Sequence, residues 1–187
     1  MYTTIKTAPA AEPIDTTTTK TMLRVDYSAD DTLIAFWISA ARQHAEEISG
    51  LVGITTTYQT WLDCWPGNGI ILLPRRPVQT ISSVKYYTAD GTLTTISASN
   101  YVLDTMAAKP ALLPAYGYSW PTDLRERDAI VIEYVAGQGA SYTAVDATYR
   151  NKIMGLVSVW YEARDGMTYE QQTRLNNLEW ALRQDGY

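Results

Sequence analysis

The sequence of 187 residues contains a single cysteine, Cys64, a single histidine, His44, and a single phenylalanine. One cysteine excludes a disulfide within the chain, which fits a reducing compartment. One histidine leaves a zinc site short of ligands, and it gives Cys64 only one imidazole that could serve as its base. We therefore expect no metal, no cofactor and no enzyme, and we weigh a cryptic Cys64–His44 hydrolase as an alternative.

Long apolar runs are also missing, since the longest, such as residues 70–73, are far too short to span a bilayer. The N-terminal residues lack the basic and apolar regions of a signal peptide, so we expect synthesis in the host cytoplasm and no membrane partner. Positive charge is scarce, because the net charge is −5 and the pI is near 4.8. This balance argues against a protein that grips nucleic acid by neutralising phosphates, with Arg75-Arg76 as the only short basic cluster.

Hydrophobic residues make up 46% of the chain and charged residues 19%, which is enough apolar surface for a folded core. The aromatic residues are 14 Tyr and 6 Trp against 1 Phe. Tyr and Trp join apolar bulk to a polar group, so they suit surfaces that become buried in a complex. Ordinary β-sheet composition explains most of them equally well.

Helical patterns lie near both ends of the chain. Apolar residues recur at helical spacing over residues 30–49 and again over residues 146–166, and Gly50 and Gly166 suit the two helix ends. A shorter helix is expected over residues 15–24, although its four consecutive threonines are poor helix formers. A last helix is expected over residues 168–185, with a capping box at its start and an apolar seam of Leu175, Leu178 and Leu182.

The middle of the chain has the signals of β-structure. Residues 54–65 alternate with a period of two, and the Asp90-Gly91 pair between two strand-like runs predicts a hairpin. Residues 129–136 are apolar on both faces except at Glu133, so they belong in the centre of a sheet. Further short strands are expected over residues 70–73, 78–88, 92–96, 101–105 and 111–113. Residues 137–139 read as a flexible joint.

These elements predict an α+β fold, in which a small α-helical bundle of N- and C-terminal helices carries an inserted antiparallel β-rich lobe. We expect the bundle to comprise residues 14–50 and 143–187, and the lobe residues 51–142. Residues 1–13 contain three alanines and two prolines without periodicity, which predicts a flexible N-terminal arm. The arm and the joint at 137–139 are candidates for segments that become ordered on binding a partner.

Some side chains could carry chemistry, but each has a simpler interpretation. His44 with Glu46 and Glu47 is typical of a solvated helix surface. Cys64 is typical of a small hydrophobic residue on a strand. The tryptophans of the β-rich region could form a platform for sugar rings, as in a carbohydrate-binding module, or could pack on strand faces and anchor loops; these are Trp61, Trp65 and Trp120.

Within about residues 13–182, an ordered series of short segments runs from residue 22 to residue 164. It comprises MLRVD at 22–26, DDTLI at 30–34, AAR at 40–42, QTW at 59–61, LPRRPV at 73–78, ISSVKY at 81–86, YVLD at 101–104, PAYG at 114–117, SWP at 119–121, YVAG at 134–137 and WYEAR at 160–164. No one segment is specific, but the ordered set resembles the head–tail connector (adaptor) proteins of tailed bacteriophages and related gene-transfer particles.

The resemblance implies a structural protein of the virion neck, at the interface between head and tail. Such proteins form a homo-oligomeric ring of about twelve copies beneath the portal protein, a dodecamer. The C-terminal segment engages the portal, and the other end receives the tail, a stopper or a tail-terminator protein. Double-stranded DNA passes through the ring's channel during packaging and ejection without sequence-specific binding. The alternative within this class is another neck component or a tail-completion protein.

Two groups of candidate contact residues follow from this interpretation. The terminal helix offers a portal contact made by Tyr169, Arg174, Leu178, Trp180, Leu182 and Arg183. The β-rich lobe offers a contact between subunits made by Trp61, Trp65, Tyr87 and Trp120.

Overall fold

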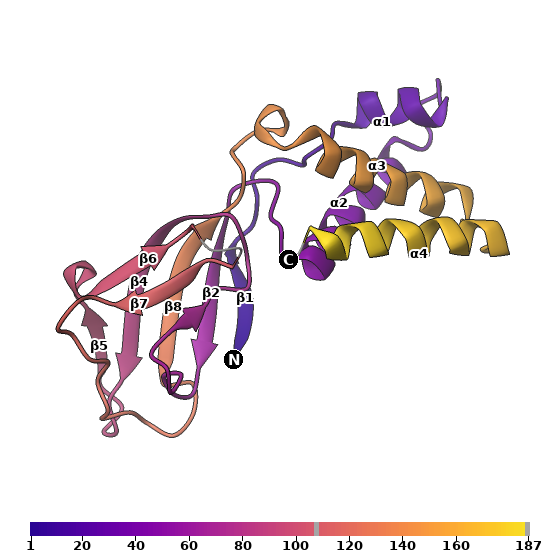
Figure 1. Cartoon of the computed structure of the whole chain (residues 1–187). Coiled ribbons are helices and arrows are strands. Elements are labelled where there is room, and N and C mark those ends of the chain that lie inside the picture. The colour runs from indigo at the N-terminus through magenta and orange to yellow at the C-terminus, as the bar shows by residue number, and fades with distance from the viewer. Residues whose placement is uncertain (107–108, 186–187) are drawn as a thin grey trace. The chain divides into compact units, whose positions relative to one another are not determined.

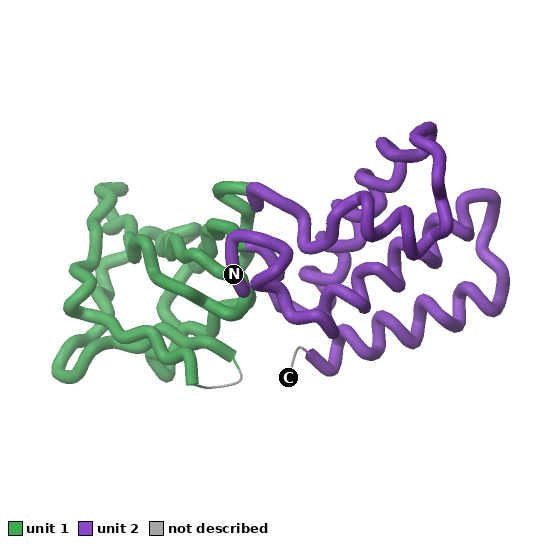
Figure 2. The backbone as a smooth tube through the Cα atoms, turned by 90° about the horizontal axis from the view of Figure 1, so that it is seen from above, with its two compact units in different colours: residues 1–8, 55–137 green, residues 9–54, 138–187 purple. Residues whose placement is uncertain are grey.

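The computed structural model describes residues 1–106 and 109–185 (Figure 1). The chain forms two compact units, which we call the β unit, residues 1–8 and 55–137, and the helical unit, residues 9–54 and 138–187 (Figure 2). The predicted α+β class is therefore confirmed, with helices contributed by both ends of the chain and antiparallel sheets between them. The unit boundaries fall at 8/9, 54/55 and 137/138, whereas the sequence suggested 50/51 and 142/143.

The β unit contains a five-stranded antiparallel sheet with the order β1-β2-β8-β4-β5. Its strands are β1 (Tyr2–Thr7), β2 (Thr56–Leu62), β4 (Val78–Tyr87), β5 (Leu93–Ile96) and β8 (Ile130–Ala136). The strand β8 lies between β2 and β4, as its two-sided apolar pattern predicted, because both of its faces are covered. The predicted Asp90-Gly91 hairpin joins β4 to β5. A smaller sheet has the order β3-β7-β6, made of β3 (Ile71–Leu72), β7 (Ala111–Pro114) and β6 (Tyr101–Asp104), the last preceded by a 3-10 helix (Ala98–Asn100).

The prediction of a flexible arm over residues 1–13 does not hold for residues 2–7. Residues Tyr2–Thr7 form β1, an edge strand that pairs with β2. The Thr3 and Thr60 hydroxyls lie 2.7 Å apart, and Lys6 Nζ lies 2.5 Å from a Glu133 carboxylate oxygen. Threonine suits a half-buried pleated surface. The six residues of β1 nevertheless carry no local signal of their own, because their partners on β2 are fifty or more positions away.

The helical unit contains α1 (Thr16–Leu23), α2 (Asp31–Ser49), α3 (Ala147–Glu162) and α4 (Tyr169–Gln184), with a 3-10 helix (Tyr142–Ala144) before α3. The threonine-rich α1 forms because its start is well capped: Asp15 accepts a hydrogen bond from the Thr18 backbone N–H at 2.7 Å. The Thr19 hydroxyl adds a bond to the Asp15 carbonyl at 2.9 Å. The predicted capping box of Thr168 and Gln171 is present at the start of α4.

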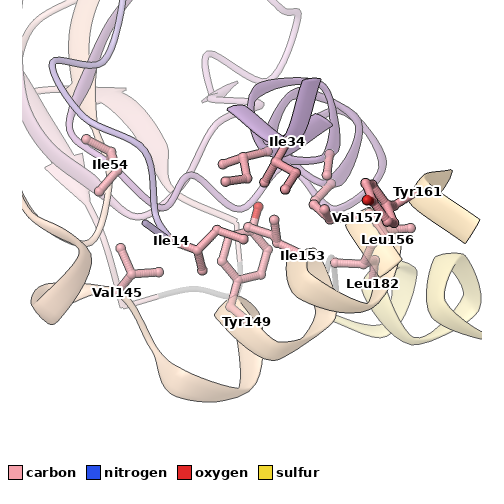
Figure 3. Close-up of a cluster of buried hydrophobic side chains, with 13 residues drawn as sticks. Ile14, Ile34, Ile54, Val145, Tyr149, Ile153, Leu156, Val157, Tyr161 and Leu182 are labelled. Carbon is pink, nitrogen blue, oxygen red and sulfur yellow. The ribbon is translucent and has the colours of Figure 1, made fainter. Parts of the chain in front are cut away.

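The core of the helical unit is built from the predicted stripes of α2 and α3. Figure 3 shows Ile34 of α2, Ile153 and Leu156 of α3 and Leu182 of α4 among its buried side chains. The helices α3 and α4 approach closely at Gly155, where a Cβ would lie 3.0 Å from a Leu178 methyl carbon. No helix within residues 1–106 and 109–185 is long and apolar enough to cross a membrane.

The expected flexible joint at 137–139 is instead held by hydrogen bonds. The Gly137 N–H donates to the Pro77 carbonyl within the β unit, and the Gln138 N–H donates to the Gly53 carbonyl within the helical unit, at 2.9 and 3.0 Å. Gly139 is required by space, since a Cβ there would lie 2.3 Å from the Ala144 Cβ. Gly139 therefore allows this segment to pack closely against Ala144.

Candidate interaction surfaces

The outward face of α4 carries two of the predicted portal-contact residues. Tyr169 is 87% exposed and Trp180 is 65% exposed. They are eleven residues apart, which places them three turns apart on the same side of the helix, together with the exposed Thr173 and Asn176. We call Tyr169, Thr173, Asn176 and Trp180 the α4 outer stripe. Large aromatic side chains on a polar helix face are the kind of residues that dominate protein interfaces.

Two other residues of the predicted portal contact face inward, which corrects the sequence-based set. Leu182 is 0% exposed and belongs to the core of the helical unit. Leu178 packs over Gly155 of α3. Their spacing along α4 places them opposite Trp180, so the three leucines of the predicted seam dock α4 onto its own unit.

The predicted arginines of α4 remain at the surface. Arg174 lies 3.0 Å from a Glu162 oxygen and Arg183 lies 3.8 Å from a Glu179 oxygen. Exposed ion pairs of this kind contribute little to stability, so both guanidinium groups are available to a partner.

In the β unit, Trp65 and Trp120 stack on each other with ring centroids 4.5 Å apart. Trp120 is only 9% exposed, and its indole N–H donates to the Gly69 carbonyl at 2.8 Å. The Trp65 indole N–H donates to the Pro121 carbonyl at 2.8 Å. These two residues therefore anchor loops, and the subunit contact predicted for them stays a prediction. A sugar platform needs open ring faces, and stacking covers one face of each of these two rings.

The remaining two residues of the predicted subunit contact are partly accessible. Trp61 is half-buried on the face of β2 opposite to the buried side chains, and Tyr2 of β1 stacks on it at 6.2 Å. One face of the Tyr87 ring is covered by the Arg125 guanidinium, whose carbon lies 3.6 Å from the ring centroid. One ring face of each residue is covered by a neighbour, and both stay candidates.

Several exposed apolar residues were missed by the sequence analysis. Phe36 of α2 is 60% exposed and lies edge-on to Trp37. Its position outside the stripe of α2 was a usable signal, because an off-stripe aromatic residue has no place in the core. Ile5 of β1 and Leu93 of β5 are each about half exposed, which only the strand order could reveal.

A polar cluster joins the start of α2 to the end of α3. One carboxylate oxygen of Asp30 accepts hydrogen bonds from the hydroxyls of Tyr161 at 2.5 Å and Tyr27 at 3.0 Å, and Arg164 lies 3.4 Å away. The hydrogen bond from Tyr161 is the main cause that lowers the pKa of Asp30. The same network, led by the bond to Tyr161, raises the pKa of Tyr27 to about 12. This arrangement fixes one end of the α2–α3 pair.

The residues considered for catalysis belong to different units. Cys64 belongs to the β unit and is exposed just beyond the end of β2, so its predicted place as a strand hydrophobe is wrong. His44 belongs to the helical unit, where its Nε2 lies 2.9 Å from a Glu179 oxygen of α4. The predicted solvated cluster is also wrong at Glu46, which is buried beside Arg42 at 3.1 Å. Within the described residues no group of three His, Cys, Asp or Glu side chains could hold a metal ion.

Charge is divided unequally between the two units. The β unit contains seven Lys and Arg and seven Asp and Glu, so its formal charge is zero. The helical unit contains eight Lys and Arg against thirteen Asp and Glu, which accounts for the whole net charge of −5. Six of its eight cationic side chains lie 2.5–3.8 Å from a carboxylate oxygen: Lys20, Arg42, Lys152, Arg164, Arg174 and Arg183.

Comparison with known proteins identifies the fold. No protein-family model and no curated protein matches the sequence. Solved structures of gene transfer agent (GTA) particles do match. In the neck of an empty GTA particle, computed with C6 symmetry, one chain has a TM-score of 0.81 and 23% identity, covering 98% of this chain and 95% of that chain. A chain of the native GTA virion gives a TM-score of 0.78 with 22% identity, covering 95% of each chain. The neck of the native particle, computed with C12 symmetry, gives 0.76 with 21% identity, covering 98% of this chain and 95% of that chain.

Proposed function

We propose that this protein is a virion structural protein, a head–tail connector (adaptor) of a phage-like particle, located in the neck and without enzymatic activity. The observation that carries the proposal is the match of fold over 98% of the chain to a chain in a GTA particle neck. The ordered sequence segments resembling bacteriophage connectors support it from a second direction.

Assembly into a ring is the second part of the proposal. The similar chains occur in necks computed with C6 and C12 symmetry, which favours a ring of copies of this chain. The interface of such a ring is heterologous, so two different faces of each subunit meet. The half-buried Trp61 and its exposed partner Tyr2 are candidates for one of these faces.

The charge distribution supports passage of double-stranded DNA without sequence-specific binding. The helical unit is acidic, and four of its eight cationic side chains lie 2.5–3.4 Å from a carboxylate oxygen: Lys20, Arg42, Lys152 and Arg164. A protein grips duplex DNA by releasing counterions from phosphates, which requires free cationic groups. A subunit of this composition in the wall of a channel repels DNA and lets it slide.

We assign the portal contact to the α4 outer stripe, with Arg174 and Arg183 beside it. Burying the two aromatic rings of Tyr169 and Trp180 would provide most of the binding energy, since hot spots cost at least about 2 kcal/mol each when truncated. The tail, a stopper or a tail-terminator protein would then occupy a different face of the ring.

Imaging of the particle neck tests the location. A reconstruction of the neck from a particle that carries this chain with a bulky tag is expected to show the extra density directly below the portal. Density at the tail tip, on the tail tube or further down the neck would contradict the connector assignment, and the last result would favour the alternative of another neck component.

Binding to the isolated portal protein of the same particle tests the α4 outer stripe. Tyr169→Ala and Trp180→Ala are each expected to weaken binding at least about tenfold while circular dichroism is unchanged. Tyr142→Ala is the matched control, because Tyr142 is an exposed aromatic residue of the same unit outside α4. Unchanged binding in both α4 variants would exclude the stripe as the portal contact.

A further inference from the structure

The five-stranded sheet of the β unit has two free edges. Among the described strands, β1 pairs only with β2 and β5 pairs only with β4, so the outer backbone groups of both are unpaired within the sheet. Such edges are pairing sites for another strand, and natural proteins usually guard them with charged side chains, proline or bulges.

On each of these two edges, a stretch of four residues lacks charged side chains, proline and bulges. The regular part of β1, residues 2–5, and the whole of β5, Leu93–Ile96, are four residues each and contain neither charge nor proline. The bulge of β1 comes only after Ile5. The nearby Lys6 side chain forms an ion pair with Glu133, two strands further into the sheet, so its charge does not lie at the free edge.

The two edges also carry the same pattern of side chains. Residues 2–5 read Tyr-Thr-Thr-Ile and residues 93–96 read Leu-Thr-Thr-Ile. Ile5 and Ile96 both lie on the inner face, opposite the buried Tyr58 and Val84 respectively. Paired side by side in this register, the strands would place threonine beside threonine and isoleucine beside isoleucine, both favourable cross-strand neighbours.

We propose that β5 of one subunit pairs with β1 of the next, so that the sheets of neighbouring subunits join edge to edge around the ring. The inference deepens the proposed function and rests on the proposed ring. Four successive antiparallel pairings separate β1 from β5, so both strands run in the same direction within one sheet. Subunits related by rotation therefore bring β5 and β1 together in parallel. A second copy is the fitting occupant because the β unit has no net charge to repel its own copy.

Cysteine cross-linking tests both the pairing and its register. In a Cys64→Ser background, Thr4→Cys and Thr95→Cys would lie directly opposite on the outer face, with a separation of about 4.8 Å that suits a disulfide. A double variant is expected to give covalent ladders on oxidation of the assembled neck or of oligomers formed in concentrated solution. Gln59→Cys combined with Thr95→Cys is the matched control, because Gln59 faces the same side one strand further in and is expected to give monomers only.

Mixing the two single-cysteine variants separates the possible geometries. Cross-links only in the mixture support the head-to-tail pairing. Cross-links with Thr4→Cys alone indicate pairing of β1 with β1 and overturn the proposal. Necks that contain this chain but give no cross-link also overturn it, while the proposed function stands. Cross-linked ladders from a chain that is absent from necks would leave the edge pairing intact and remove the proposed function.

Placing a charged residue on either edge strand provides a second test of the pairing. Thr4→Lys or Thr95→Lys is expected to reduce oligomer formation at least about tenfold in light scattering, because a lysine on the edge opposes strand pairing. Gln59→Lys serves as the control and is expected to assemble normally. Wild-type assembly by both edge variants would contradict the proposal.

Discussion

The β unit and the helical unit are stabilised in different ways, although they contain similar numbers of residues. The β unit is formally neutral and is held by backbone ladders, with β8 paired on both edges. The helical unit contains the whole charge excess and relies on an apolar core together with caps and ion pairs. Neutral surfaces suit contacts between copies of one chain, because charges of the same sign repel each other. Acidic surfaces suit the wall of a DNA channel, because they repel the phosphates. The division of charge therefore matches a division of proposed roles.

The largest expected effect is on the buried ion pair of the helical unit. Burial lowers the pKa of Arg42, but its hydrogen bond to Glu12 and the charge of Glu46 outweigh burial and raise it. Arg42→Ala leaves the buried Glu46 without this partner, which is expected to cost about 3–5 kcal/mol in urea unfolding. Arg174→Ala breaks an exposed pair and is the control, with an expected loss below about 1 kcal/mol. Equal losses in the free energy of unfolding for both variants would show that burial of the Arg42–Glu46 pair does not increase its contribution to stability.

Cavities in the two cores test how far the units are separate. Ile132 of β8 and Ile153 of α3 are both fully buried, and replacing either with alanine is expected to cost about 2–5 kcal/mol. Hydrogen exchange is expected to show the loss of protection chiefly in the unit that holds the cavity, because the side chains around Ile153 all belong to the helical unit. Equal loss in both units from either variant would show one cooperative fold.

Loop anchoring in the β unit has a smaller expected effect. Trp120→Phe keeps an aromatic ring against Trp65 but removes the hydrogen bond to Gly69, and it is expected to cost about 1 kcal/mol. Trp61→Phe is the comparison, since its half-buried ring stacks on Tyr2 at the sheet surface and a smaller change is expected. Thermal unfolding measures both. A larger loss for Trp61→Phe would reverse the assignment of their roles.

The smallest expected effect is a difference in acid sensitivity. Hydrogen bonds lower the pKa of Asp15, Asp30 and Asp146 in the helical unit, and that of Asp90 in the β unit. A lowered carboxyl pKa stabilises the fold above the ordinary value of 3.8, and this contribution is lost as the pH falls through the lowered pKa. Hydrogen exchange below about pH 4 is expected to weaken protection in the helical unit first. Asp30→Asn is expected to reduce that difference, and earlier loss in the β unit would contradict it.

The sequence predicted elements whose signals are local. The stripe of α2 and its end at Gly50, the capping box of α4 and the hairpin at Asp90-Gly91 were all correct, since each depends on residues a few positions apart. The central place of β8 followed from its two apolar faces. The strand β1 was missed because its stability comes from β2, which is distant along the chain.

Candidate contact residues were harder to predict because exposure is not a property of residue type. Trp120 and Trp180 are the same amino acid, yet one anchors a loop and the other stands in solvent. Leu182 was assigned to a partner surface although its spacing with Leu175 and Leu178 already placed it on the inner face of α4.

The sequence by itself determined the α+β class, the helices at both ends, the central strand and the acidic balance, because periodicity, caps and charge are fixed by neighbouring residues. Only the tertiary structure decided that residues 2–7 close one edge of a sheet, that Arg42 and Glu46 are buried together, and that the net charge belongs to one unit. These properties depend on which distant segments meet, and pairing of that kind is set by the packing of the whole chain.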